Sequence, residues 1–176
     1  MRALVDLLLS EDLESITIAS IVARADVGRS TFYTHFRGRD DILKASLSFP
    51  SAPLARIVGE PVEVVVLLPL LAHFREQRRL ARAFTQGPLR RLWVRRLAEL
   101  IEPDLSALAL RLRARPLLPV ALASLEVAEL QIALIVQWLA SRDPVPPEAV
   151  AEALIALTRA AVAALLATPK EGARGN

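Results

Sequence analysis

The sequence contains no cysteine, and its only histidines are His35 and His73. Without cysteine the chain forms no disulfide and has no thiolate nucleophile, which fits a reducing compartment. It also has no glycine-rich phosphate loop and no His-x-x-x-His or Glu-x-x-His spacing that would bind a metal ion. We therefore expect a protein that is not an enzyme and that has no catalytic residue, no metal site and no cofactor.

Aromatic residues are also scarce, at 5% of the sequence, whereas 53% of it is hydrophobic. Alanine and leucine dominate, and no run of strand length alternates apolar and polar residues. The sequence therefore predicts an all-α fold. With 176 residues the chain is long enough to bury a core in one or two domains.

Signals for membrane targeting are missing as well. The apolar start, residues 1–10, is interrupted by Asp6 and followed by Glu11 and Asp12, unlike a cleavable signal peptide. No uncharged apolar run reaches the roughly 18 residues that span a bilayer. We expect a soluble, cytoplasmic protein without a membrane partner.

The net charge of +3 is too small to indicate a partner by itself. The first 46 residues hold six basic and seven acidic side chains, so that segment is not basic overall. The position of the charges is more informative, because Arg29, Arg37, Arg39 and Lys44 cluster within 16 positions of one another. The local field of such a cluster, rather than the total charge, decides whether an anion is attracted.

Residues 17–44 have the pattern of a helix-turn-helix followed by a supporting helix. Thr17 is a suitable N-cap, and Ile18, Ile21, Val22 and Ala25 recur at the spacing of one helix face. Ser20 stands where a capping box would have Glu, so we expect a one-sided cap. Residues 26–28, Asp-Val-Gly, predict the turn between two helices that meet at a steep angle.

A second short helix should follow the turn at residues 29–35. Phe32 and Phe36 lie four apart and would anchor one face in the core. The opposite face would carry polar side chains suited to DNA, because arginine bonds guanine edges while hydroxyls and tyrosines bond bases or phosphates. This exposed set contains Arg29, Ser30, Tyr33, Thr34 and His35. Arg37 and Arg39 just after the helix could hold the phosphate backbone.

These residues together resemble the DNA-binding domain of the TetR/AcrR family of bacterial regulators. The resemblance covers about the first quarter of the chain. It comprises Thr17, Ile21, Ala25-Asp26-Val27, the recognition-helix run Thr31-Phe32-Tyr33-Thr34-His35-Phe36, and Arg39-Asp40-Asp41-Ile42-Leu43 as the start of a fourth helix. The resemblance implies an N-terminal three-helix DNA-binding domain and a C-terminal helical domain for ligand binding and dimerisation. The DNA contacts that we expect on this basis are Thr17, Arg29, Ser30, Thr31, Tyr33, Thr34, His35 and Arg39.

Two positions depart from the family pattern. The sequence begins with residues that should already lie inside the first helix, so the basic arm that usually precedes this helix is either lost or lies upstream of Met1. Gly28 also stands where the family often has Ser, although Gly is an acceptable N-cap. These departures leave an alternative open, namely a dimerising paralogue with weakened or lost DNA binding.

We expect three segments: a DNA-binding domain at residues 1–47, an effector-binding and dimerisation domain at 53–168, and a flexible tail at 169–176. Residues 49–53, Phe-Pro-Ser-Ala-Pro, predict the break between the two domains. Further helices are expected at residues 62–77 with a kink at Pro69, 80–86, 89–115 with a kink or split at Pro103, 121–141 and 148–167.

The last two helices have more apolar surface than one core face requires, so a partner surface is expected. In the resembled family these helices form a four-helix dimer interface, which implies a homodimer on a palindromic double-stranded operator. The interface residues that we expect are Leu125, Ile132, Val136, Leu139, Leu154, Leu157, Ala161 and Leu165.

The middle helices should form a pocket for an unknown small-molecule effector. Effector binding would favour a conformer in which the recognition helices no longer match the operator, which is ligand-controlled repression. The candidate lining residues are His73, Phe74, Phe84, Trp93, Gln131 and Trp138, and for each the alternative is plain core packing. The arginine-rich segment 75–96 is either a solvated face or, alternatively, an anionic effector site or accessory phosphate contact.

Overall fold

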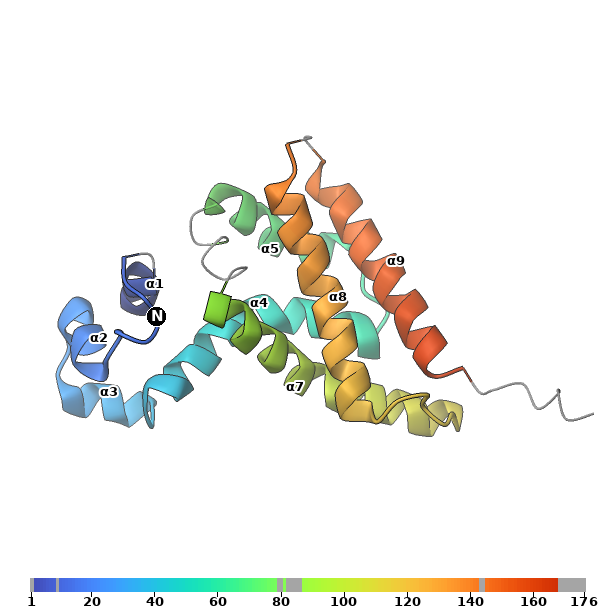
Figure 1. The fold of residues 1–176 in the computed structure, drawn as a ribbon, viewed down its shortest axis with the longest axis horizontal. Helices are drawn as coiled ribbons and strands as arrows, with labels where there is room; N and C mark the ends of the chain where they lie inside the picture. Colours follow the sequence, from blue (N-terminus) through green and yellow to red (C-terminus); the bar gives the residue numbers. More distant parts are fainter. Residues whose placement is uncertain (1, 9, 79–80, 82–86, 143–144, 168–176) are drawn as a thin grey trace, which may run out of the picture.

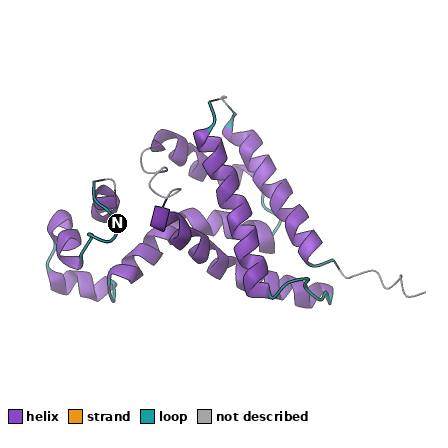
Figure 2. Cartoon of the chain, in the orientation of Figure 1, coloured by secondary structure: helices purple, strands orange, loops and turns teal. Residues whose placement is uncertain are grey.

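The computed structural model describes residues 2–8, 10–78, 81, 87–142 and 145–167. Within these ranges every regular element is an α-helix (Figure 2), which confirms the predicted fold class. The helices are α1 (Arg2–Leu8), α2 (Ile18–Ala25), α3 (Arg29–His35), α4 (Arg39–Gly59), α5 (Val64–Glu76), α7 (Gly87–Leu112), α8 (Val120–Ala140) and α9 (Pro147–Leu165).

Helices α1, α2 and α3 form a small unit at one end of the molecule (Figure 1). Their apolar residues pack on the first half of α4, where Ile42, Leu43 and Leu47 are buried. Phe32 of α3 is 4% exposed and Phe36 is half-buried against the same core, as the sequence predicted. Helix α3 is therefore packed on the core through its inner face, and its outer face is exposed.

Helix α4 continues without interruption through residues 49–53, so the predicted interruption of helical structure between the two domains is wrong. Pro50 and Pro53 both lie inside the helix and remove backbone donors from it. The packing compensates, because α4 lies along α7 with Ser51 and Leu54 fully buried between them. Tertiary burial thus overrides the local preference of proline. The proposed boundary between the two domains falls inside this helix.

At its far end α4 approaches α7 very closely. A Cβ atom added at Gly59 would lie 2.8 Å from Cγ of Asp104 on α7. No side chain other than hydrogen fits there without moving Asp104. Gly59 therefore allows the last turn of α4 to pack against α7.

The remaining helices follow the sequence expectations with shifted ends. α5 contains Pro69, and α7 runs through Pro103 as one helix rather than two. Gly87 and Pro88 begin α7 instead of ending the preceding helix, which agrees with the preference of proline for a first helical turn. The helix predicted at residues 80–86 falls almost entirely outside the described residues, as do Phe84 and the tail beyond residue 167.

Helices α8 and α9 lie side by side on the outer side of the larger helical body (Figure 1). By length and composition alone α8 could cross a membrane, since its mean hydropathy over 18 residues is 1.6. However, Ala128, Ile132 and Ile135 of α8 are fully buried, and Glu129 forms an ion pair with Arg90 of α7. α8 is thus a core helix of the fold that carries additional apolar residues outward.

Candidate DNA-binding surface

A reciprocal hydrogen-bond pair fixes the start of α2. The backbone N–H of Ser20 donates to Oγ1 of Thr17 over 3.1 Å, and the backbone N–H of Thr17 donates to Oγ of Ser20 over 2.9 Å. The expectation of a one-sided cap is therefore wrong, because a serine hydroxyl reaches the N-cap amide as a Glu carboxylate would. Thr17 is exposed, but its side chain already serves as the helix cap.

The structure has a turn between α2 and α3 at the predicted residues. Asp26 ends α2 with φ at 52°, in the left-handed region that aspartate tolerates better than most residues. The N–H of Val27 then donates to the carbonyl of Val22 over 3.1 Å, which closes the helix end. Gly28 is the N-cap of α3 with an ordinary φ of −70°, so this position does not require glycine.

The outer face of α3 is open to solvent. Its residues Arg29, Ser30, Thr31, Tyr33, Thr34 and His35 are all exposed, which leaves the predicted DNA contacts accessible. Tyr33 is 56% exposed, and its ring is nearly perpendicular to that of Phe32, with 5.5 Å between the ring centroids. The hydroxyl of Thr34 donates to the carbonyl of Ser30 over 3.0 Å and is therefore partly engaged within the helix.

Arg39 differs from the other candidate contacts. Its Nη1 donates to the carbonyls of Leu13 and Ile16 over 3.4 and 3.3 Å. The side chain is 38% exposed and also lies 3.9 Å from the carboxylate of Asp40. Arg39 thus ties the start of α4 to the loop between α1 and α2, and it has fewer donors to offer to a phosphate than an unpaired arginine would.

Arg37 occupies the exposed turn between α3 and α4. Its backbone N–H donates to Oδ2 of Asp41 over 3.0 Å, while its side chain is exposed. The turn therefore holds the Arg37 side chain beside the recognition helix without an ion-pair partner among the described residues. The exposed side chain, unpaired within the described residues, makes Arg37 a better candidate for a phosphate contact than Arg39.

Three of the predicted effector-pocket residues belong to the packed core instead. Phe74 and Trp93 are 4% and 0% exposed, and their rings meet edge to face at 5.5 Å. Gln131 is fully buried, and its Nε2 donates to Oγ1 of Thr158 and to the carbonyl of Leu54 over 3.0 and 3.2 Å. The two aromatic side chains pack on each other, as the alternative of core packing predicted, whereas Oε1 of Gln131 is buried without a hydrogen-bond partner among the described residues. Aromatic and amide side chains on a buried helix face give the same sequence pattern whether they line a ligand cavity or pack against one another in the core.

The other pocket candidates lie apart from that core cluster. His73 is half-buried and stacks edge to face with Phe49, at a centroid distance of 6.4 Å. Trp138 borders a hollow of about 240 Å³ together with Arg75 and Arg78, and its Nε1 donates to the carbonyl of Val145. The five candidates that the structure describes therefore do not form one pocket, and Phe84 lies outside the described residues.

The predicted dimer residues divide into two groups. Ile132 and Leu154 are 0% exposed within the single chain, so their assignment to a dimer surface is wrong. They are buried because α8 packs on α7 and α9 packs on α5, which the helical spacing alone did not show. The other six remain accessible, with Leu157 46% exposed and Leu125, Val136, Leu139, Ala161 and Leu165 half-buried.

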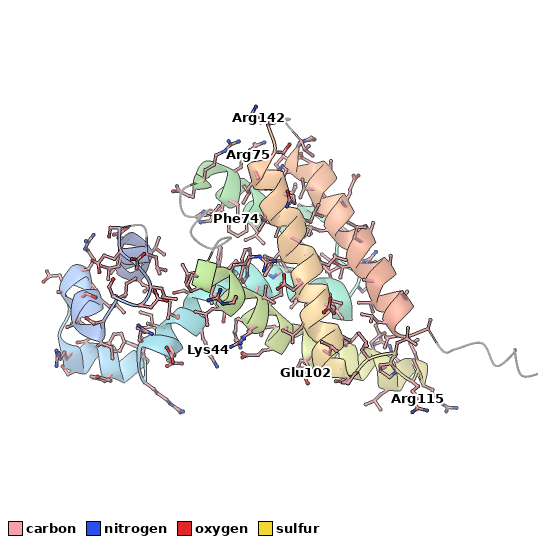
Figure 3. The ribbon with its side chains drawn as sticks, viewed as in Figure 1. Lys44, Phe74, Arg75, Glu102, Arg115 and Arg142 are labelled. Atoms are coloured by element: carbon pink, nitrogen blue, oxygen red, sulfur yellow. The ribbon has the colours of Figure 1, made fainter. Side chains whose placement is uncertain are left out.

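The sequence did not predict a charged cluster where α4 passes α7. Lys44 and Ser48 of α4 lie beside Arg96 and Glu99 of α7 (Figure 3 labels Lys44). About fifty positions separate the two halves of this cluster in the sequence. No local pattern could therefore have joined them, and only the arginine-rich composition of the segment 75–96 gave a signal.

Comparison with known families agrees with this geometry. Residues 1–46 match the family model described as bacterial regulatory proteins, tetR family. A comparison with curated proteins found no significant match.

Two solved structures share the fold over most of their length. A TetR transcriptional regulator from Streptococcus agalactiae is 21% identical, with 89% of each chain covered and a TM-score of 0.55. A putative TetR-family transcriptional regulator from Syntrophomonas wolfei is 16% identical, with 96% of this chain and 95% of that chain covered and a TM-score of 0.55.

Proposed function

Residues 1–46 make the chain a member of the tetR family of bacterial transcriptional regulators, and on this basis we propose that it is a ligand-responsive repressor. In this proposal the protein acts as a homodimer in the bacterial cytoplasm, associated with the nucleoid. It binds a palindromic operator and releases it when a small-molecule effector binds.

The observation that carries operator binding is the open outer face of α3. Six consecutive or near-consecutive exposed residues, all able to donate or accept hydrogen bonds, project from a helix whose inner face is fixed by Phe32. A helix presented in this way fits the major groove, where arginine and hydroxyl side chains read base edges. Arg37 at the end of α3 supports the same function as a backbone phosphate contact.

The accessible apolar side chains of α8 and α9 support dimerisation. Leu157 is 46% exposed, and half-buried Leu125, Val136 and Leu165 extend the apolar surface over both helices. Leaving this surface in water is unfavourable at about 25 cal/mol per Å², so a second copy packed on it would be stabilised. Two-fold symmetry would then place two α3 helices on half-sites roughly 34 Å apart.

DNA binding is tested by selecting bound oligonucleotides from a random pool and measuring affinity by electrophoretic shift. We expect salt-dependent binding, because phosphate contacts release counterions. Arg29→Ala should lower affinity about tenfold or more, as expected for loss of a base contact. Arg142→Ala is the matched control, because Arg142 is exposed in the loop after α8, away from α3 (Figure 3).

Two outcomes would count against this function. Equal losses for Arg29→Ala and Arg142→Ala would show that only overall charge matters. Absence of binding to any sequence, in a protein that still dimerises, would favour the alternative of a paralogue that has lost operator recognition.

A further inference from the structure

A cavity of about 310 Å³ lies where the first half of α4 faces α7. We call it the joint cavity, because α4 links the helix-turn-helix to the rest of the molecule. Leucine side chains form its apolar walls, and six charged side chains line it: Arg39, Asp40 and Lys44 from α4, and Arg95, Arg96 and Glu99 from α7. None of these groups belongs to the exposed face of α3.

The lining has more positive than negative charge. Four cations face two carboxylates, so the lining carries a net +2. Glu99 is shared, with Oε2 3.0 Å from Nη1 of Arg96 and Oε1 3.9 Å from Nζ of Lys44. Arg95 is exposed and has no ion pair among the described residues. The side chain of Asp40 is 87% exposed, so its carboxylate lies largely in water. Its Oδ1 is 3.9 Å from Nε of Arg39.

Excess cationic charge and apolar walls together favour one class of ligand. An anionic group gains charge-assisted hydrogen bonds from guanidinium and ammonium donors. The leucine walls would accept a compact apolar body, and the volume lies near the lower end of the range for small-molecule sites.

We propose that the joint cavity binds a small organic anion, consisting of a phosphate or carboxylate group on a compact apolar body. This assignment rests on the proposed ligand response and names the effector's chemical class. The anion competes with Glu99 for Lys44 and Arg96. Because Glu99 and Ser48 connect α4 with α7 through these side chains, occupation of the cavity changes how the DNA-binding end of α4 is held.

The test is calorimetric titration of the full chain without DNA, using phenyl phosphate, benzoate and the neutral benzyl alcohol as probes. We expect one or both anions to bind at a single site and the alcohol not to bind. Arg95→Gln should weaken anion binding about tenfold, because it removes the cation without a competing partner. Arg91→Gln is the matched control, since Arg91 is exposed on the same helix outside the cavity.

A third variant gives a change of opposite sign. Glu99→Gln removes the carboxylate that competes for Lys44 and Arg96, so anion binding should become about fivefold tighter. A purely structural role of Glu99 would instead leave binding unchanged or weaken it. Measurements at low and high salt should show the affinity falling with ionic strength.

Several results would overturn the assignment. Benzyl alcohol could bind as tightly as the anions, or Arg95→Gln could bind the anions with wild-type affinity. Arg91→Gln could lose as much anion affinity as Arg95→Gln. Finally, neither anion could show saturable binding up to about 10 mM, which corresponds to a binding free energy weaker than about 3 kcal/mol. A loss of DNA affinity in ligand-free Arg95→Gln would show that these cations contact DNA phosphates instead. Since the titration contains no DNA, its failure is distinguishable from a failure of operator binding.

Discussion

The indole Nε1 of Trp93 donates a hydrogen bond to Oγ of Ser51 over 3.1 Å and so joins the middle of α4 to α7. Ser51 in turn donates to the carbonyl of Leu47 over 2.7 Å, and both Trp93 and Ser51 are fully buried. The bond lies between Pro50 and Pro53, in the segment of α4 with the fewest backbone donors. Trp93 thus contributes to the continuity of α4 and is not available to line a pocket.

Trp93→Phe should lower the free energy of unfolding by about 1 to 3 kcal/mol, through the lost hydrogen bond and the space left by the smaller ring. Ser51→Ala should cost a similar amount, because the buried indole N–H loses its acceptor. In urea denaturation the double variant should cost about 1 kcal/mol less than the two single losses combined. Strict additivity would show that the two side chains do not stabilise α4 jointly.

Thr17→Val removes the acceptor that caps α2 and should lower stability by about 1 kcal/mol, as measured by thermal unfolding. Thr17→Ser keeps the hydroxyl and should lose little. If Thr17→Val reduced only DNA affinity and left unfolding unchanged, the hydroxyl would act as a phosphate ligand and not as a cap.

Tyr33→Phe removes one exposed hydroxyl and should leave stability within about 0.5 kcal/mol of the wild type. Operator affinity should fall about threefold to tenfold if the hydroxyl bonds a phosphate or base. Phe32→Ala is the complementary variant, because it removes a 4% exposed core side chain and should cost about 3 to 5 kcal/mol of stability. A large stability loss in Tyr33→Phe would place Tyr33 with the core residues.

Leu157→Glu should abolish dimerisation without unfolding the chain, because Leu157 is 46% exposed in the single protomer. Leu154→Glu, three positions away and 0% exposed, should instead unfold the protein. Sedimentation equilibrium gives the mass and circular dichroism gives the helical content. A wild-type protein that stays monomeric at micromolar concentration, or a dimer that survives Leu157→Glu, would contradict the proposed interface.

The sequence predicted α2, the turn and α3 well because their signals are local. Thr17, Asp26 and Phe32 indicate a helix cap, a turn and a core anchor within sixteen positions, and the structure has all three. Each of these signals acts through the backbone or through neighbours one helical turn away. The open face of α3 then follows from helical geometry alone.

The sequence failed where distant packing decides the structure. Pro50 and Pro53 predict a break by local rules, yet the helix persists because Trp93, about forty positions later, packs on it. The spacing of Ile132 and Leu154 correctly gave one apolar face per helix. It did not show whether that face meets the same chain or a second copy, because both environments require the same residue types.

Arg39 and Gly59 lie at the two ends of one unbroken helix, so a movement of one end is coupled to the other. A helix of 21 residues is about 30 Å long, so a tilt of about 10° about its distal end displaces the other end by roughly 5 Å. The distal end lies close against the Asp104 side chain of α7, and the near end directly follows α3. A rigid rotation of α4 about its Gly59 end would therefore appear at its other end as a shift about as large as one turn of helix.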